Sequence, residues 1–174
     1  TNSLYKGIRS MKPVEIRNVV IPNYYSSANG IHLLDQADGS SIRDVRIRDS
    51  ACGNAIHVES VDNVRIDNAL LSDTLRLTGN WMHVSRVSLD ATSAYCYING
   101  TFMVFDNCVF SRRFEITSGQ NIRIANCRFD YDIDTDGATD VCFDRCYFNV
   151  NFPSIQDART FGNITIQNNN TYLT

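Results

Sequence analysis

Arg113, Glu115, Asp132 and Asp134 are the residues of this sequence whose types and spacing could perform chemistry. The two aspartates follow the arginine and the glutamate by 19 positions each, within short segments that alternate apolar and polar residues. If the chain stacks upon itself at that step, Glu115 lies over Asp134 and Arg113 lies over Asp132. A 19-residue repeat would therefore bring three carboxylates and one guanidinium onto a single surface.

Stacked carboxylates about 5 Å apart repel each other, and the pKa of one of them rises. A neutral carboxylic acid beside an ionised carboxylate is the arrangement that hydrolyses glycosidic bonds. The pattern therefore makes Glu115, Asp132 and Asp134 candidate catalytic residues of a polysaccharide hydrolase or lyase. A surface ladder of ion pairs, in which Arg113 neutralises Asp132, is the alternative that the same spacing allows.

Strand alternation adds candidate ligand-binding residues. If Ile56, Leu75, Tyr95 and Phe114 point inward, their neighbours point outward. The outward residues expected in this way are His32, His57, Glu59, Arg76, Cys96, Arg113, Glu115, Asp132 and Asp134. An exposed indole at Trp81 could stack on a sugar ring. The ligand-binding candidates are His57, Arg76, Trp81 and Arg113, although the histidines could equally be ordinary exposed residues.

The sequence predicts no metal site and no cofactor. Residues 132–137, DIDTDG, match the first half of a calcium-binding loop, but position twelve would be Phe143 rather than Glu. Cys142 and Cys146 have the spacing of a metal-ligand pair, yet no second pair of His or Cys completes a zinc site. We therefore expect reduced cysteines and a solvated acidic turn.

An internal repeat indicates the elements that would position these residues. An alternating strand, then Asn or Arg, then a small residue and a large apolar one recur along the chain. The copies begin at Val14, Val45, Val64, Met82, Met103, Ile122, Val141 and Ile164, and the steps from Val45 onward are 19, 18, 21, 19, 19 and 23. A second short strand precedes most copies. A circuit of about 20 residues with two or three strands is typical of a parallel β-helix.

We therefore predict an all-β fold, a right-handed single-stranded parallel β-helix of about seven coils with about 19–21 residues per coil. Equivalent residues of stacked coils lie above one another, so they form ladders. The ladders expected are Cys108, Cys127 and Cys146 in the interior, Phe110, Phe129 and Phe148 as an aromatic stack continued by Leu89 and Leu71, and Asn68, Asn107 and Asn126 in a turn where amides bridge backbone groups. Arg86 and Arg145 interrupt the asparagine ladder.

Length, charge and hydrophobicity indicate the domain organisation and argue against some classes of partner. We expect residues 1–174 to form one domain with residues 1–12 as a lead-in, and to be a piece of a longer chain because residue 1 is Thr. Net charge is −3 and no basic block occurs, which argues against nucleic-acid binding. No run of about 18 apolar residues occurs, which argues against insertion into a membrane.

The repeats NVRIDNALLSD, NIRIANCRFD and GNITIQNNN are similar to coils of the pectin-lyase-like right-handed β-helix superfamily. The resemblance covers roughly residues 12–174. The NTD, DD, GHG and RIK motifs of polygalacturonases are missing, so no catalytic residue is carried over. Among the members, the short coils look most like a bacteriophage tailspike or appendage domain. That resemblance implies a homotrimer, on a virion tail or outside the cell, that binds and often cleaves surface polysaccharide.

The sequence is therefore compatible with two functions. The first is a carbohydrate-recognising tailspike or receptor-binding domain, with a polysaccharide or glycan as its partner, that could also cleave its ligand. The second is a structural shaft or spacer of a virion appendage or surface protein, whose outer faces carry only ion pairs or subunit contacts. A complete polysaccharide hydrolase or lyase is disfavoured, because short coils without long loops provide few walls for a deep active site.

Overall fold

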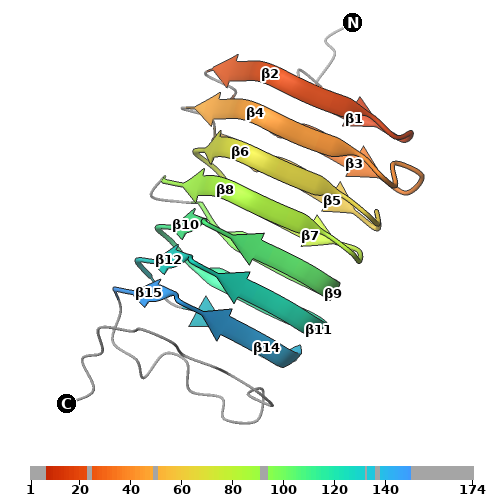
Figure 1. The fold of residues 1–174 in the computed structure, drawn as a ribbon. Coiled ribbons are helices and arrows are strands. Elements are labelled where there is room, and N and C mark those ends of the chain that lie inside the picture. Colours follow the sequence, from red (N-terminus) through yellow and green to blue (C-terminus); the bar gives the residue numbers. More distant parts are fainter. Residues whose placement is uncertain are drawn as a thin grey trace, which may run out of the picture.

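The protein winds as a parallel β-solenoid of about seven turns (Figure 1). The computed structural model describes residues 7–22, 25–48, 51–90, 94–131, 133–135 and 138–149, without the side chains of residues 25–28, 48, 51 and 52. All regular structure within these residues is β-strand, in one network of 15 strands. The predicted all-β parallel β-helix is confirmed. Asp132 and the repeats at residues 151–155 and 164–171 lie outside the described residues.

Three runs of parallel strands line the core, and successive coils stack along the solenoid axis (Figure 1). The first face contains β1 (Ile8–Ser10), β3 (Tyr25–Leu34), β5 (Ala51–Glu59), β7 (Leu75–Thr78), the starts of β9 (Cys96–Asp106) and β11 (Phe114–Ala125), and β13 (Ile133–Asp134). The predicted lead-in, residues 1–12, thus contains β1, which pairs with β3.

The second face contains the starts of β2 (Glu15–Pro22), β4 (Ser41–Arg48), β6 (Arg65–Leu71) and β8 (His83–Leu89), the ends of β9 and β11, and β14 (Ala138–Asp144). The third face contains the ends of β2, β4, β6 and β8, and then β10 (Val109–Phe110), β12 (Arg128–Phe129) and β15 (Tyr147–Phe148). Each coil therefore contributes to all three faces.

The length of a coil varies more than the repeat predicted. Equivalent residues on the third face are Val20, Arg46, Leu70, Ser88, Val109, Arg128 and Tyr147, which gives steps of 26, 24, 18, 21, 19 and 19. The alignment of Val45 with Val64 was wrong, because Val45 pairs with Ala69. The segment SIRDVRIR alternates apolar and polar residues on both sides of Asp44. The pattern alone therefore allows two alignments with the next coil, which differ by five residues.

The bend between the second and third faces is a single residue with left-handed backbone. It is occupied by Asn18, Asp44, Asn68, Arg86, Asn107, Asn126 and Arg145, with φ between 51° and 55°. This conformation crowds the Cβ atom, and Asn and Asp tolerate it best. The predicted turn ladder is therefore confirmed, but its amides donate to carboxylates rather than to backbone groups: Asn68 to Asp44 at 2.6 Å, and Asn126 to Asp106 at 2.8 Å.

The residue after this bend points into the core, and in three successive coils it is cysteine. Cys108, Cys127 and Cys146 are all buried, and the backbone N–H of Cys108 donates to the Sγ of Cys127 at 3.4 Å. Each thiol donates to the carbonyl oxygen two residues earlier, at 3.1–3.6 Å. Hydrogen bonds with the Cys108 and Cys146 thiols raise the pKa of Cys127 and burial raises it further, so this thiol stays protonated. The cysteines of the described side chains are free, as predicted.

The predicted aromatic ladder lies in the core of the carboxy-terminal coils. Phe129 stacks on Phe110 and on Phe148 with ring centroids 5.2 Å apart in both pairs, and it meets Phe114 and Phe143 edge to face. Leu89 pairs with Phe110, and Leu71 pairs with Leu89, so the ladder continues toward the amino-terminal coils as predicted. Parallel and edge-to-face contacts of this kind stabilise a core beyond the apolar area that they bury.

Replacing Phe129 by Ala is expected to lower the free energy of unfolding by about 3–5 kcal/mol, because it removes a fully buried ring and leaves a cavity between two aromatic neighbours. Urea denaturation followed by circular dichroism measures this. Tyr131→Ala is the matched control, because Tyr131 is 44% exposed and its loss should cost less than about 1 kcal/mol. Similar losses in the two variants would contradict the assignment of Phe129 to the core.

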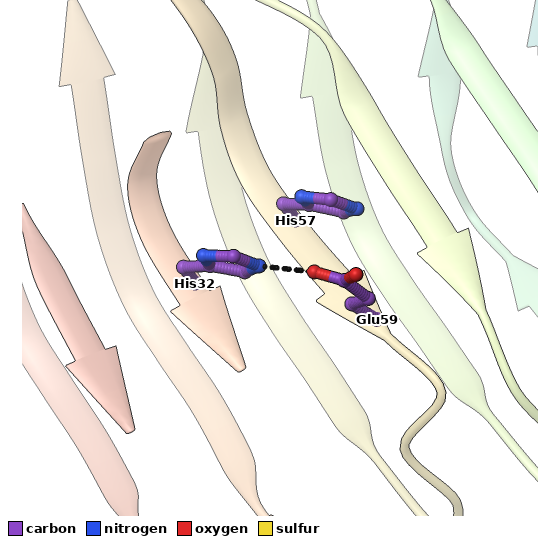
Figure 2. A group of neighbouring side chains, drawn as sticks. All are labelled: His32, His57 and Glu59. Atoms are coloured by element: carbon purple, nitrogen blue, oxygen red, sulfur yellow. Dashed lines mark hydrogen bonds and ion pairs between the residues drawn. The ribbon is translucent and has the colours of Figure 1, made fainter. Parts of the chain in front are cut away.

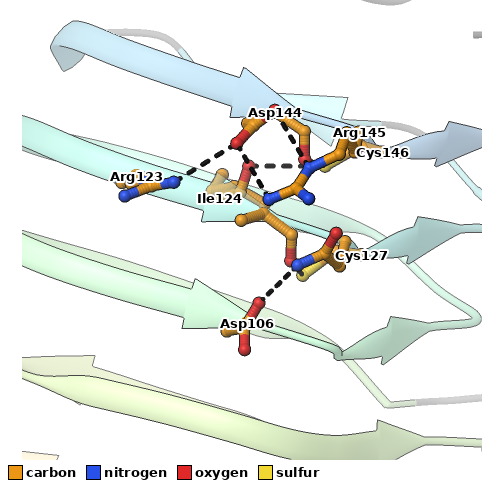
Figure 3. Close-up of polar contacts among 9 residues, drawn as sticks. Asp106, Arg123, Ile124, Cys127, Asp144, Arg145 and Cys146 are labelled. Carbon is orange, nitrogen blue, oxygen red and sulfur yellow. Dashed lines mark hydrogen bonds and ion pairs between the residues drawn. The ribbon is translucent and has the colours of Figure 1, made fainter. Parts of the chain in front are cut away.

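Arg145→Asn is expected to raise the free energy of unfolding by about 0.5–1 kcal/mol, because Asn relieves the left-handed strain while only an exposed ion pair with Asp144 is lost. Figure 3 shows this pair beside the ion pair of Arg123 with the same carboxylate. Arg123→Asn is the control, because Arg123 lies in β11 and has no such strain to relieve. A gain in both variants would show that the bend is not the cause.

Candidate functional site

An outward column on the first face brings together most of the predicted site residues. In-register pairing aligns one residue from each of seven successive coils: Arg9, His32, His57, Arg76, Tyr97, Glu115 and Asp134. These side chains alternate with buried residues such as Ile56, Leu75 and Phe114, so they project away from the core. We call these seven residues the axial column. It is basic at its amino-terminal end and acidic at its carboxy-terminal end.

The middle of the axial column lies in a shallow groove of about 260 Å³. Its outward lining consists of Arg76, Thr78, Tyr97, Asn99, Glu115 and Thr117. The Arg76 guanidinium carbon lies 6.0 Å from the centre of the Tyr97 ring, within the range of a cation–π contact. Tyr95 stacks against Tyr97 at 5.7 Å between ring centroids and is 39% exposed. The groove therefore combines an aromatic surface with hydroxyl, amide and charged groups.

Arg113 joins the two carboxylates at the acidic end of the column. Its Nη2 lies 2.5 Å from Asp134 Oδ2, and its Nε lies 3.3 Å from Glu115 Oε2. The bond to Asp134 raises the pKa of the guanidinium, which is charged in any case. Glu115 pairs with Asp134 across β11 and β13, as the 19-residue spacing predicted. The predicted partner of Arg113, Asp132, lies outside the described residues.

A second cluster occupies the amino-terminal half of the column (Figure 2). The rings of His32 and His57 are parallel, with centroids 4.6 Å apart, and His32 Nε2 lies 2.8 Å from Glu59 Oε2. The bond from His32 lowers the pKa of Glu59. Burial lowers the pKa of His57, and the neighbouring His32 lowers it further. These three side chains are also the group of described residues that could hold a metal ion.

Trp81 does not lie in the axial column. It occupies the corner between the first and second faces in left-handed backbone, with φ of 59°, and is not among the residues that line the groove. Its ring stacks on that of Phe102, with centroids 4.1 Å apart, and Phe102 is left-handed too. Trp81 is 56% exposed, as a ring available to a ligand would be, and it lies outside the groove around Arg76 and Tyr97.

The sequence reasoning missed Tyr95 because it assigned the wrong phase to one strand. Tyr95 was expected inside and Cys96 outside, yet Cys96 is 1% exposed and pairs with Phe114. The register of β9 and β11 shifts between Ile116 and Ser118, so the extra residue, Thr117, changes the step from 18 to 19 within one coil. The 19-residue step of the cysteine ladder therefore does not hold between the starts of β9 and β11, where the step is 18.

Two other hollows of the described surface have no aromatic side chain in their lining. One of them, about 600 Å³, lies along the left-handed bend and is lined by residues such as Asn18, Asp44, Asn68 and Arg86. Within the described residues, no helix has the length and apolar character needed to cross a membrane.

Comparison with protein-family models, with curated proteins and with solved structures gives no match to this chain. The parallel β-solenoid is consistent with the pectin-lyase-like superfamily fold that the repeats resemble. Function must therefore be argued from the side chains of the site.

The low pKa of His57 gives a pH dependence of stability. The pKa of His57 is about 6.5 in the unfolded chain and lower in the folded protein. As pH falls below about 6.5, the unfolded chain therefore binds a proton at His57 before the folded protein does, and the folded protein loses stability. We expect the free energy of unfolding, measured with urea in the presence of EDTA, to fall from pH 7.5 to about pH 5. His57→Asn should flatten this part of the profile, whereas His83→Asn, on the second face, should not.

Proposed function

We propose that this chain is a carbohydrate-recognising β-helix domain of a phage tailspike or receptor-binding appendage, and that the axial column binds an extended polysaccharide. The observation that carries the proposal is the in-register alignment of Arg76, Tyr97, Glu115 and Asp134 within and beside one groove. A column parallel to the solenoid axis offers one side chain per coil, so an extended polymer can contact several coils in succession.

The chemistry of the groove supports a sugar rather than an apolar ligand. The exposed Tyr95 and its neighbour Tyr97 offer aromatic faces for the C–H groups of a pyranose ring. Thr78, Asn99 and Glu115 offer hydroxyl, amide and carboxylate groups to the hydroxyl groups around that ring. The groove is open and shallow, which suits a polymer that extends beyond it at both ends.

The ion pairs of Arg113 favour binding over cleavage. A guanidinium next to a carboxylate stabilises its ionised form, whereas a general acid must be protonated at working pH. Arg113 contacts both Glu115 and Asp134. Both carboxylates are therefore held by a cation rather than turned toward a bound sugar, and we propose recognition of the polysaccharide as the main activity, with Glu115 and Asp134 as the residues to test for cleavage.

We extend the proposal to a homotrimer on a virion tail or outside the cell, as in the appendage proteins that the repeats resemble. The second face carries the surface that such an assembly would use. Phe102 and Val104 are 42% and 36% exposed on β9, and Trp81 stacks on Phe102 at the adjoining corner. Exposed apolar side chains that lie next to each other in this way are typical of subunit contacts.

A structural shaft is the second candidate, and the ion pairs between coils favour it. Glu15 pairs with Arg43, Asp67 pairs with Arg86 at 2.5 Å, and Arg123 pairs with Asp144 at 3.2 Å. All three lie at the second face or its bend, away from the axial column. They would make a stiff rod without any ligand, so the two candidates differ in whether the first face binds saccharide.

Binding of polysaccharide is expected to depend on Tyr97. A glycan array followed by calorimetry on the best ligand should show at least a tenfold weaker affinity for Tyr97→Ala, because the aromatic surface in the groove is lost. Tyr147→Ala is the control: Tyr147 is 46% exposed on the third face, and its loss should leave the affinity unchanged. Absence of binding to any saccharide, or equal affinities for the two variants, would favour the shaft.

The same ligand tests for cleavage. Release of reducing ends from the bound polysaccharide, lost in both Glu115→Gln and Asp134→Asn, would establish cleavage and would contradict the argument from Arg113. Binding without release, in the wild type and in both variants, is the result that we expect.

A further inference from the structure

We propose that His32, His57 and Glu59 form a binding site for one zinc ion on the amino-terminal half of the axial column (Figure 2). The site does not depend on carbohydrate recognition, because it lies outside the groove around Tyr97. Three described residues of the types that bind zinc meet there, and their arrangement follows from the pairing of β3 with β5.

The backbone register brings the three ligands together. His32 pairs with His57 across the two parallel strands, and Glu59 lies two residues after His57 on the same outward side of β5. One donor atom from each side chain lies within 4.8 Å of the other two. In Figure 2 the two imidazoles lie parallel and the Glu59 carboxylate lies beside the His32 ring nitrogen, with which it makes the 2.8 Å bond.

Small side-chain rotations convert this cluster into a coordination site. Zinc binds imidazole nitrogen and carboxylate oxygen at about 2.0–2.2 Å in a tetrahedron, which places neighbouring donor atoms about 3.4 Å apart. The parallel rings must therefore turn toward each other, and the His32–Glu59 bond must give way to two bonds to the metal. Glu59 is half exposed, so its carboxylate has room to turn. The fourth position faces solvent and would take a water molecule.

The residues behind the cluster position His57. Its Nδ1 lies 3.3 Å from the Asn29 amide nitrogen, and the Asn54 amide donates to Asn29 Oδ1 at 2.7 Å. This contact occupies Nδ1 and leaves Nε2 as the ligand atom. When Nε2 binds a metal, Nδ1 carries the hydrogen, and a joint flip of the Asn29 and Asn54 amides would supply an Asn29 oxygen that accepts it while Asn29 donates to Asn54 Oδ1.

Ligand type and charge determine which ion fits. Two imidazoles and one carboxylate select zinc or a similar transition metal over calcium and magnesium, which prefer a full set of oxygen ligands. Arg9 and Arg76 lie next to the cluster in the axial column, and their charges oppose a cation. Both arginines are exposed, so solvent and salt screen that repulsion.

Calorimetric titration of the EDTA-stripped chain with zinc chloride, without saccharide, tests the proposal. We expect one zinc ion per chain, and at least tenfold weaker binding for Glu59→Gln and for His57→Asn. His83→Asn is the matched control, because His83 lies on the second face and pairs with Arg65 rather than with a ligand. Calcium and magnesium chloride should give no binding under the same conditions.

Cobalt chloride provides a readout that reports the ligands directly. A tetrahedral cobalt site absorbs visible light strongly, and zinc should displace the cobalt and abolish the absorption. Circular dichroism checks that each variant is folded, and Glu59→Gln keeps the fold because its side chain is half exposed. The proposal is overturned if the wild type binds no zinc, or if Glu59→Gln and His57→Asn bind it as the wild type does.

Discussion

Backbone hydrogen bonds between successive coils determine the interior and the surface of this protein together. Parallel strands pair residue against residue, so each inward position repeats above itself and each outward position does too. The phenylalanine ladder around Phe129 and the axial column around Tyr97 are two results of the same register. A shift of one residue would send both to the opposite side of the sheet. The core therefore fixes the surface side chains that a ligand would meet.

The ladders of equally long coils could be read from the sequence, and those of unequal coils could not. Cys108, Cys127 and Cys146 repeat at 19 residues because both coils between them have that length on the third face, and the structure stacks them as predicted. The first two coils hold 26 and 24 residues, and Thr117 forms a bulge on the first face. The repeat pattern reveals such insertions poorly. Apolar and polar residues keep alternating across a bend, so the pattern does not show which residues of two coils lie opposite each other. Tyr95 was misplaced for this reason.

The contacts of the candidate site were likewise predictable only where the coil between the two residues has the repeat length. The pairing of Glu115 with Asp134 followed from the 19-residue step, since no insertion intervenes. The contact of His32 with His57 spans a longer coil of 25 residues, so both were expected on the outside but not as a stacked pair. The corner position of Trp81 could not be inferred from the sequence, because a left-handed corner is where the residue pattern predicts Gly or Asn. At this corner Trp81 and Phe102 both adopt the left-handed backbone, and their rings stack on each other.

One side chain per coil gives the axial column a property that a pocket lacks. In a solenoid each turn contacts only the turns beside it, so tandem duplication of one coil would lengthen the rod without disturbing the rest. It would also add one more side chain to the row on the first face. The length of this row and the length of the molecule therefore grow together. Under the proposed function, copying a single turn would change the number of contacts that the protein makes with a repeating polymer.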